Sequence, residues 1–326
     1  MSSNITLALQ IQILHLQSVS RNIAIILGLT LFVVGVIGNL LNIITFYTLG
    51  NWKYNPSSFY ILVKSFADIL CLLVGVLLET VGNGFLLNLT SKNRIWCKLR
   101  FPLTCVPFLI SLTCICLQSI DVYFCSSQSV AVRRKSNIRV ARCLIVGFLF
   151  LWIAQTIPNL VFQDLVQIGT VFACRAQNLA YTQYISYFIS LGLFVVIPIT
   201  IISIFGCFTY KNLHMKTTQN RRVLSSISRQ MVNISFLQIF SLLLFQLPYG
   251  SMLVYSLSTS NVVKDNYRSV QEQVAGTFLY AFAFCTASVS GIFAFEFSVI
   301  TFLFFSYRST VIVLHQNDFD DKLFLD

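Results

Sequence analysis

Three ionisable side chains stand inside long apolar stretches of this chain, where they could form a charged cluster. Lys64 and Asp68 are four residues apart, close to one helical turn, and Glu296 lies in the last apolar stretch. An ionised group in the hydrocarbon region of a bilayer costs about 3 kcal/mol or more, so each should face neighbouring helices and find a partner. We expect Lys64 to pair with Asp68 or Glu296. Such a cluster fits structural polar contacts between helices, and equally an ion site or a conformational switch.

Residues for catalysis or for a structural metal are not grouped in the sequence. No nucleophile, base and orienting residue stand together at a readable spacing. The ten cysteines include no CxxC pair, and His15, His214 and His315 are far apart. We therefore expect neither an enzyme nor a metal centre.

The composition is that of a membrane protein. Of the 326 residues, 56% are hydrophobic and 10% are charged, whereas soluble domains carry about 25% charged residues. The net charge of +11 comes from basic residues in short loops between apolar stretches, so it indicates membrane orientation rather than nucleic-acid binding. The N-terminal segment lacks a charged start and a small-residue cleavage site, and we expect the first span to direct insertion itself.

Seven apolar stretches are long enough to cross a bilayer as helices. The sequence thus predicts an all-α membrane protein, a seven-transmembrane helix bundle, with an outer segment over residues 1–22, a bundle over 23–306 and a cytoplasmic tail over 307–326. The expected spans are 23–48, 58–82, 101–125, 140–162, 181–209, 230–256 and 274–306.

The orientation follows from charge and from glycosylation signals. With the N-terminus outside, the inner segments hold thirteen Lys and Arg residues and the outer segments eight, which agrees with the positive-inside rule. The Asn-x-Ser/Thr signals at Asn4 and Asn88 then lie outside, where glycosylation occurs, and a third at Asn233 lies within a span. We expect a multi-pass protein of the plasma membrane.

The third stretch carries a polar signal at each end. Cys97 stands at its head and Asp121-Val122-Tyr123 at its foot, 24 residues later, which is about 36 Å along a helix. Cys174 lies in the next outer loop, so Cys97 and Cys174 share one side of the membrane as two free thiols or as a disulfide.

These residues resemble the rhodopsin-like G-protein-coupled receptors over about residues 20–308. The cysteine and the Asp-x-Tyr of the third stretch match that family's third helix. Trp152, Pro198 and Pro248 match its most typical residues in the fourth, fifth and sixth helices, and Asn39 precedes Asp68 by 29 residues, close to the family spacing. In character the chain is most like the peptide receptors.

The resemblance implies several sites. It implies a Cys97–Cys174 disulfide that tethers the second outer loop as a lid over a ligand cavity. It also implies a buried polar site of Asn39, Asp68, Ser111 and Ser298, where many members hold Na⁺, although Lys64 could supply the charge instead.

The switch residues depart from the family pattern. Asp121-Val122-Tyr123 replaces Asp-Arg-Tyr, so the cation that would contact a G protein is missing. Gln246 stands in place of a Trp beneath the ligand, and the stretch from Ser298 to Phe302 stands in place of Asn-Pro-x-x-Tyr.

The expected ligand cavity is formed by Glu79, Arg100, Thr104 and Gln246. Thr104, seven residues after Cys97, takes the place of the Asp with which amine receptors bind an ammonium, so a peptide or an anionic ligand is favoured over an amine. Arg100 could instead extend to the interface. The resemblance implies a receptor that passes an extracellular signal to heterotrimeric G proteins. Two alternatives stay open, namely a receptor-like protein that does not activate G proteins, and an ion transporter or channel that uses the intramembrane charges.

Overall fold

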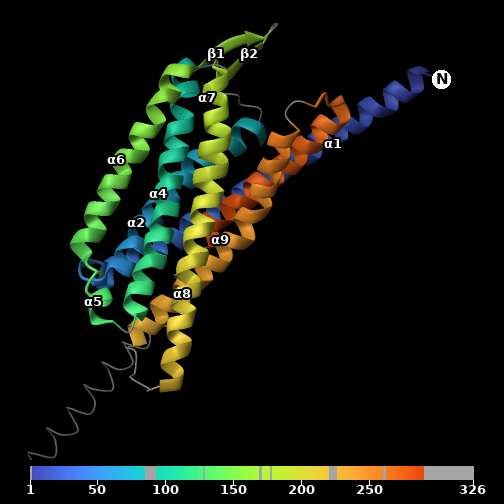
Figure 1. Ribbon diagram of the computed structural model, residues 1–326. Coiled ribbons are helices and arrows are strands. Elements are labelled where there is room, and N and C mark those ends of the chain that lie inside the picture. The colour runs from blue at the N-terminus through green and yellow to red at the C-terminus, as the bar shows by residue number, and fades with distance from the viewer. Residues whose placement is uncertain are drawn as a thin grey trace, which may run out of the picture.

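The computed structural model describes residues 2–84, 93–127, 129–168, 171–176, 178–219, 226–259 and 262–289. Within these ranges six helices are long and apolar enough to cross a membrane, and residues 266–289 form a further helix at the start of the seventh expected span. The helices pack side by side as a bundle, with the N-terminal part of α1 projecting beyond it (Figure 1). The chain is therefore a seven-helix membrane bundle, as the sequence predicts.

Several spans combine two or three helical elements. In chain order the elements are α1 (Ser2–Leu49), η1 (Asn51–Lys53), α2 (Pro56–Cys71), η2 (Leu72–Leu77), η3 (Thr80–Gly84), α4 (Arg94–Ser126), α5 (Val130–Arg133), α6 (Ile138–Phe162), α7 (Leu179–Gln183), η4 (Tyr184–Val196), α8 (Ile197–Gln219) and α9 (Ser226–Ser258). The π-helical segments η2, η3 and η4 continue the second and fifth spans.

Asparagine side chains fix where four of these helices begin. Asn55, Asn93, Asn137 and Asn178 precede α2, α4, α6 and α7, and each side chain accepts a hydrogen bond from a backbone N–H of the first turn. Asparagine is among the best residues for this role because its oxygen satisfies an N–H that has no partner within the helix.

The first helix is longer than the sequence suggested. The expected span is 23–48 with a separate outer segment before it, but α1 runs without a break from Ser2. Residues 2–27 contain neither glycine nor proline, so nothing in the sequence interrupts the helix.

The central helix of the bundle is α4, which packs against α2, α6, α8 and α9. Its buried residues Leu112 and Ile115 lie in a core cluster with Leu72, Ile202 and Leu242. Lipid tails are as apolar as these side chains, so the helices associate through close packing and polar contacts rather than through exclusion from water. One such contact joins α6 to α4, where Trp152 Nε1 donates to Thr113 Oγ1 at 3.1 Å.

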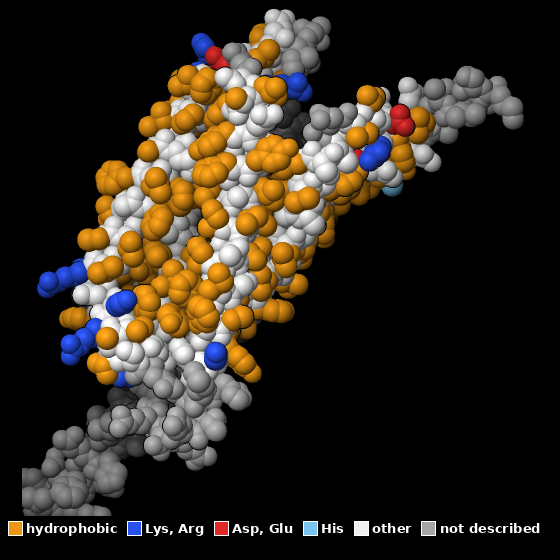
Figure 2. All heavy atoms as spheres, in the orientation of Figure 1, with side chains coloured by type: hydrophobic (Ala, Val, Ile, Leu, Met, Phe, Trp, Pro, Cys, Tyr) orange, Lys and Arg blue, Asp and Glu red, His pale blue; other side chains and the backbone are white. Residues whose placement is uncertain are grey.

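The face of the bundle seen in Figure 2 is apolar between two charged ends. Figure 2 shows hydrophobic side chains along the length of α6 and α8, while Lys and Arg side chains gather near the ends. Side chains such as Phe150 and Val161 are exposed on α6, as expected where a helix faces lipid.

The loop between α6 and α7 contains a β-hairpin that was not predicted from the sequence. Strands β1 (Gln163–Ile168) and β2 (Val171–Ala176) are antiparallel, with Leu165 opposite Cys174. The hairpin lies between α6 and α7, outside the membrane spans, so the predicted helical bundle is unaffected. Val166, Ile168 and Val171 are β-branched and surround Gly169 in the sequence, a pattern typical of a hairpin that a count of apolar stretches does not detect.

Candidate functional site

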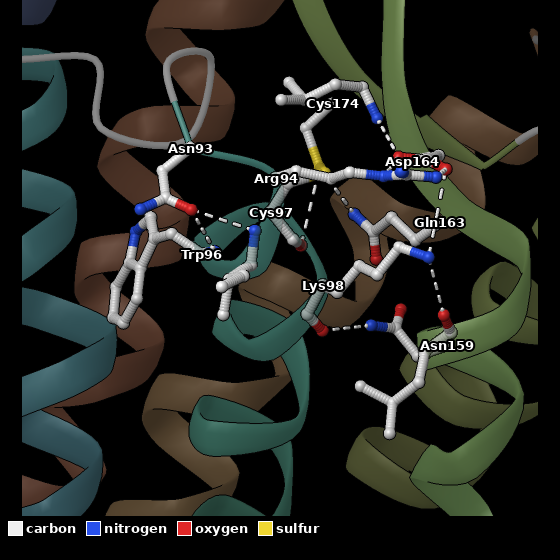
Figure 3. Close-up of a disulfide and its surroundings, with 12 residues drawn as sticks. Asn93, Arg94, Trp96, Cys97, Lys98, Asn159, Gln163, Asp164 and Cys174 are labelled. Carbon is white, nitrogen blue, oxygen red and sulfur yellow. Dashed lines mark hydrogen bonds and ion pairs between the residues drawn. A yellow bond between two sulfur atoms is a disulfide. The ribbon is translucent and has the colours of Figure 1, made fainter.

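A disulfide anchors the hairpin to the bundle. Cys97, on the first turn of α4, is bonded to Cys174 of β2, with 5.7 Å between their Cα atoms (Figure 3). The bond that the resemblance implies is thus present. It holds the hairpin at the N-terminal end of α4.

Ionic contacts tie the hairpin to the same helix a second time. The Arg94 guanidinium donates from Nε to Asp164 Oδ1 at 2.7 Å and from Nη2 to Asp164 Oδ2 at 2.5 Å (Figure 3). This hydrogen bonding lowers the pKa of the Asp164 carboxyl to about 2. Lys98 adds a weaker contact to Asp164 at 3.8 Å. This pair was not predicted from the sequence, although Asp164 is the only acidic residue between α6 and α7 and Arg94 lies on the same side of the membrane.

Beneath the hairpin lies a cavity of about 300 Å³. Gln163 and Cys174 of the hairpin contribute to its lining, together with Arg100 and Thr104 of α4 and Ser190 of η4. The rest is largely aromatic and comes from α4, η4, α9 and the helix over 266–289, with Phe101, Phe108, Phe194, Tyr249, Tyr280 and Phe284. An apolar, mainly aromatic wall with a few polar groups is typical of a small-molecule or side-chain pocket.

A second cavity of about 310 Å³ adjoins the first, between α1, the second span and the helix over 266–289. Arg100, Tyr280 and Phe284 line both cavities, whereas Glu79 lines only the second. Arg100 forms an ion pair with Glu79. The guanidinium therefore lies in the wall shared by the two cavities.

The expected cavity residues are only partly brought together. Arg100 and Thr104 line the first cavity and Glu79 lines the second, but Gln246 is not among the residues that line either of them. Gln246 is fully buried, and its Nε2 donates to the carbonyl of Phe194 at 3.2 Å. The placement of Gln246 at the ligand is thus corrected to a contact between α9 and η4.

Deep in the bundle, Asp68 is held by a cation and a hydroxyl. Lys64 forms an ion pair with Asp68, and Ser111 Oγ donates to Asp68 Oδ1 at 2.5 Å. Lys64 and Asp68 are 2% and 1% exposed, so this charge pair lies in the interior of the bundle. The expected pairing of Lys64 is present within α2, and the hydrogen bond from Ser111 joins α4 to α2.

Asn39 contributes a different contact from the one the resemblance suggested. Its amide nitrogen donates to the carbonyls of Gly35, at 2.8 Å, and Ala287, at 3.0 Å. Asn39 therefore connects α1 to the helix over 266–289. Ser298, which was grouped with it, lies outside the described residues, as do Glu296 and Asn88, and Asn4 lies in the first turns of α1.

At the foot of α4, the Asp121 carboxylate accepts two hydroxyl hydrogen bonds. Ser57 donates to its Oδ2 and Ser136 to its Oδ1, each at 2.5 Å. Ser57 lies in the first turn of α2 and Ser136 in the loop before α6, so Asp121 connects α4 to α2 and to that loop. Neither serine was singled out from the sequence, because both come close to Asp121 only through the packing of the helices.

The neighbours of Asp121 contact α8 and α9. Val122 is 4% exposed and lines a void of about 10 Å³ with residues of α8 and α9, among them Gly206, Thr209 and Ile239. The Tyr123 ring contacts Phe205 of α8 with 5.6 Å between ring centroids. The Val122 position is thus filled by tight apolar packing.

Comparison with known proteins assigns the family. No individual curated protein matches the chain. The family model described as 7 transmembrane receptor (rhodopsin family) matches residues 38–307, which is most of the chain. Together with the apolar helices and the disulfide, this match shows that the chain belongs to the rhodopsin family of seven-transmembrane receptors.

Proposed function

We propose that this protein is a plasma-membrane receptor that transmits the binding of an extracellular ligand to a heterotrimeric G protein. The observation that carries the proposal is the cavity below the tethered hairpin, because α4 forms part of its wall and ends at Asp121-Val122-Tyr123. A ligand that binds this end better in one arrangement of the helices shifts the population of the whole bundle. The ion-transport alternative is not favoured, because the matching family is a receptor family.

The orientation we propose places the hairpin outside the cell and Asp121 inside. Arg133, Arg134 and Lys135 lie exposed beside the foot of α4, where the positive-inside rule requires a basic loop. In this orientation the N-terminus is extracellular, and Asn4 and Asn88 are glycosylation acceptors.

For the ligand we propose a peptide with a free carboxylate near an aromatic or aliphatic side chain. The aromatic wall suits the side chain, and Arg100 is the cation at the cavity, where it can exchange Glu79 for a ligand carboxylate. Glu79 keeps the guanidinium satisfied when no ligand is present. An amine is disfavoured, because the position of Thr104 offers a hydroxyl instead of a carboxylate.

Paired substitutions at this ion pair test the ligand class. Glu79→Gln should increase the potency of a carboxylate peptide about tenfold, because Arg100 loses its competing partner, and Arg100→Gln should reduce potency by at least about tenfold. The measurement is G-protein recruitment in cells that express each variant, using a peptide library with free and with amidated C-termini.

The matched control is Lys98→Gln, which removes a cation two residues away on α4. Lys98 does not face the cavity, since its Nζ donates to the Leu160 carbonyl at 3.0 Å. Potency should be unchanged in this variant. Active peptides that tolerate amidation, with equal potency in all variants, would contradict a carboxylate at Arg100.

We further propose that Lys64 supplies the positive charge that many family members take from Na⁺. Its ammonium lies on the Asp68 carboxylate beside the Ser111 hydroxyl, so Asp68 is neutralised by a residue of the chain. On this proposal the receptor needs no Na⁺ at Asp68.

A second candidate function is a receptor-like protein that binds ligand without activating a G protein. The observation in its favour is Val122, an apolar and buried side chain in place of the family's G-protein-facing Arg. The two candidates predict different results for substitution of Val122.

A further inference from the structure

The loop between α4 and α6 combines a basic run with a serine hydroxyl that holds Asp121. Arg133, Arg134 and Lys135 are exposed, and Ser136 follows them directly. Ser136 is half-buried, and its Oγ donates to Asp121 Oδ1 at 2.5 Å. The serine is therefore at the solvent-facing edge of the bundle and is also part of the contact that fixes the foot of α4.

We propose that Ser136 is a phosphorylation site for an arginine-directed serine/threonine kinase, and that its modification detaches this loop from Asp121. In the reaction, Ser136 Oγ attacks the γ-phosphorus of a magnesium-bound nucleoside triphosphate. The new O–P bond forms as the bond from that phosphorus to the β–γ bridging oxygen breaks. The hydroxyl proton passes to the kinase's base, and nucleoside diphosphate leaves.

The charge pattern before Ser136 explains the choice of kinase. Arg133 and Arg134 stand three and two residues before the hydroxyl, on a loop where acidic subsites of a kinase can reach both guanidinium groups. Ser127 and Ser129 lie in the same loop but follow only uncharged residues. They provide an internal contrast, because they share the loop without the basic run.

Phosphorylation removes the contact to Asp121 for two reasons. A phosphoserine oxygen has no proton to donate at neutral pH, so it cannot replace the Ser136 hydroxyl as a donor. The phosphate, with a charge of about −1.5 to −2, is also repelled by the Asp121 carboxylate. It is attracted instead to the start of α6, where the helix dipole and Arg139 favour an anion. Asp121 then keeps the hydrogen bond from Ser57.

The same contact should control access to Ser136. While its hydroxyl is bonded to Asp121, the segment cannot extend into a kinase cleft, so the rate of phosphorylation reports how often the loop is released. The inference relies on the proposed cytoplasmic position of this loop but not on coupling to a G protein. The phosphorylation inference can therefore fail while the proposed receptor function stands. The receptor function can likewise fail while the phosphorylation inference stands.

The experiment uses the full-length receptor purified in detergent micelles. The receptor is incubated with the catalytic subunit of an arginine-directed kinase, ATP and Mg²⁺, and phosphate is quantified at each serine by mass spectrometry. Site resolution is needed because Ser225 also follows an arginine, Arg222, by three residues. We expect phosphate at Ser136 and none at Ser127 or Ser129.

Three variants separate recognition from release. Ser136→Ala should remove the signal at this site, and Arg133→Gln with Arg134→Gln should slow modification of Ser136 by about tenfold or more. Asp121→Asn keeps the shape of the side chain but removes the charge, and should speed modification about fivefold. Fluorescence-detected size exclusion verifies that each variant is folded.

Two results would overturn the inference. One is an absence of phosphate at Ser136 in both the natural chain and folded Asp121→Asn. The other is modification whose rate is unaffected by loss of Arg133 and Arg134. A rate that is equal in Asp121→Asn and the natural chain would overturn the coupling to Asp121.

Discussion

Asp68 and Asp121 are both buried carboxylates, and the bundle satisfies them in different ways. Asp68 has the Lys64 ammonium and a hydroxyl, whereas the two hydrogen bonds seen at Asp121 come from the hydroxyls of Ser57 and Ser136. The family has an Arg next to the carboxylate that corresponds to Asp121. In this chain Val122 takes the place of that Arg, and hydroxyl groups are the donors to Asp121. A charge pair therefore lies in the middle of the bundle and a neutral-donor contact at its foot.

Loss of Lys64 should leave the buried Asp68 carboxylate without a counter-charge. Lys64→Met leaves a buried carboxylate without its cation, which should destabilise the bundle by about 3–5 kcal/mol and lower surface expression sharply. Lys64→Met with Asp68→Asn should recover most of that loss, because no charge stays buried. The measurement is thermal unfolding in detergent together with surface expression.

The same assay tests the role of sodium. The natural chain should unfold at the same temperature in NaCl and in KCl, since Lys64 already occupies the position of the cation. Lys64→Met should be stabilised more by NaCl than by KCl, because Asp68 and Ser111 are then open to an ion. Stabilisation of the natural chain by NaCl over KCl would rule out Lys64 as the internal cation.

Among the elements, α4 and the hairpin form one covalently linked unit. The hairpin is tied to the first turns of α4 both by the Cys97–Cys174 bond and by Arg94 with Asp164. The two ties act at neighbouring positions along α4, so the disulfide limits the distance and the ion pair limits the rotation of the hairpin. We therefore expect the hairpin to be held in a single orientation over the cavity.

Acid should loosen the hairpin without breaking the disulfide. The folded-state pKa of Asp164, about 2, is below its ordinary value of 3.8, so its contribution is complete above pH 3.8 and is lost as the pH falls toward 2. A spin label at Phe172→Cys, an exposed position on β2, should become more mobile over this pH range. In Asp164→Asn the label should be mobile at all these pH values.

The spectrum of the spin label requires a protein without other exposed thiols. Cys125, Cys143 and Cys207 are therefore replaced by serine. A label at an exposed position on α6, Phe150→Cys, is the control and should be unaffected by pH. Equal mobility of the Phe172→Cys label in Asp164→Asn and in the parent would show that the disulfide alone orients the hairpin.

At the scale of the whole molecule, the central helix α4 connects the cavity beneath the hairpin to the opposite end of the bundle at Val122. Arg100 and Thr104 lie near one end of α4 and Val122 near the other. With only about 10 Å³ of void beside Val122, α8 and α9 leave no room for a larger group at this position. Opening of the bundle at Val122 therefore requires α8 and α9 to separate from α4.

Val122→Arg should favour that opening. A long cationic side chain cannot fit into the void, and overpacking of this kind costs about 1–3 kcal/mol, so the closed bundle should lose population relative to the open one by about 5- to 150-fold. Arg at this position also restores the missing G-protein contact. We expect the natural chain to recruit G protein when ligand binds and Val122→Arg to recruit it without ligand, as measured at the cell surface.

Val122→Leu is the matched control, because it adds bulk without charge and should raise basal recruitment only slightly. Recruitment by Val122→Arg alone, with a silent natural chain, would favour the receptor-like protein that does not activate G proteins. Silence from both at normal surface expression would count against coupling altogether.

Features that depend on residues close together in the sequence could be predicted from it. A bilayer leaves only helices for long apolar stretches, so the spans were predicted, and 181–209 compares with an observed Leu179–Asn212. Lys64 and Asp68 are one turn apart on one helix, so they lie close together however that helix packs against its neighbours. The pairing of Cys97 with Cys174 came from the family pattern and is also present.

Contacts between helices were decided only by the tertiary structure. Whether Gln246 faces the cavity or η4 depends on the rotation of α9 about its axis, and apolar sequence on all sides does not fix that rotation. The partners of Asn39 and Asp121 likewise come from other helices, with Ala287 for the first and Ser57 for the second. The membrane-crossing segments follow from local sequence, because lipid requires each of them to be a long apolar helix. Only packing determined which polar groups meet inside, because tilt and rotation of each helix depend on all its neighbours at once.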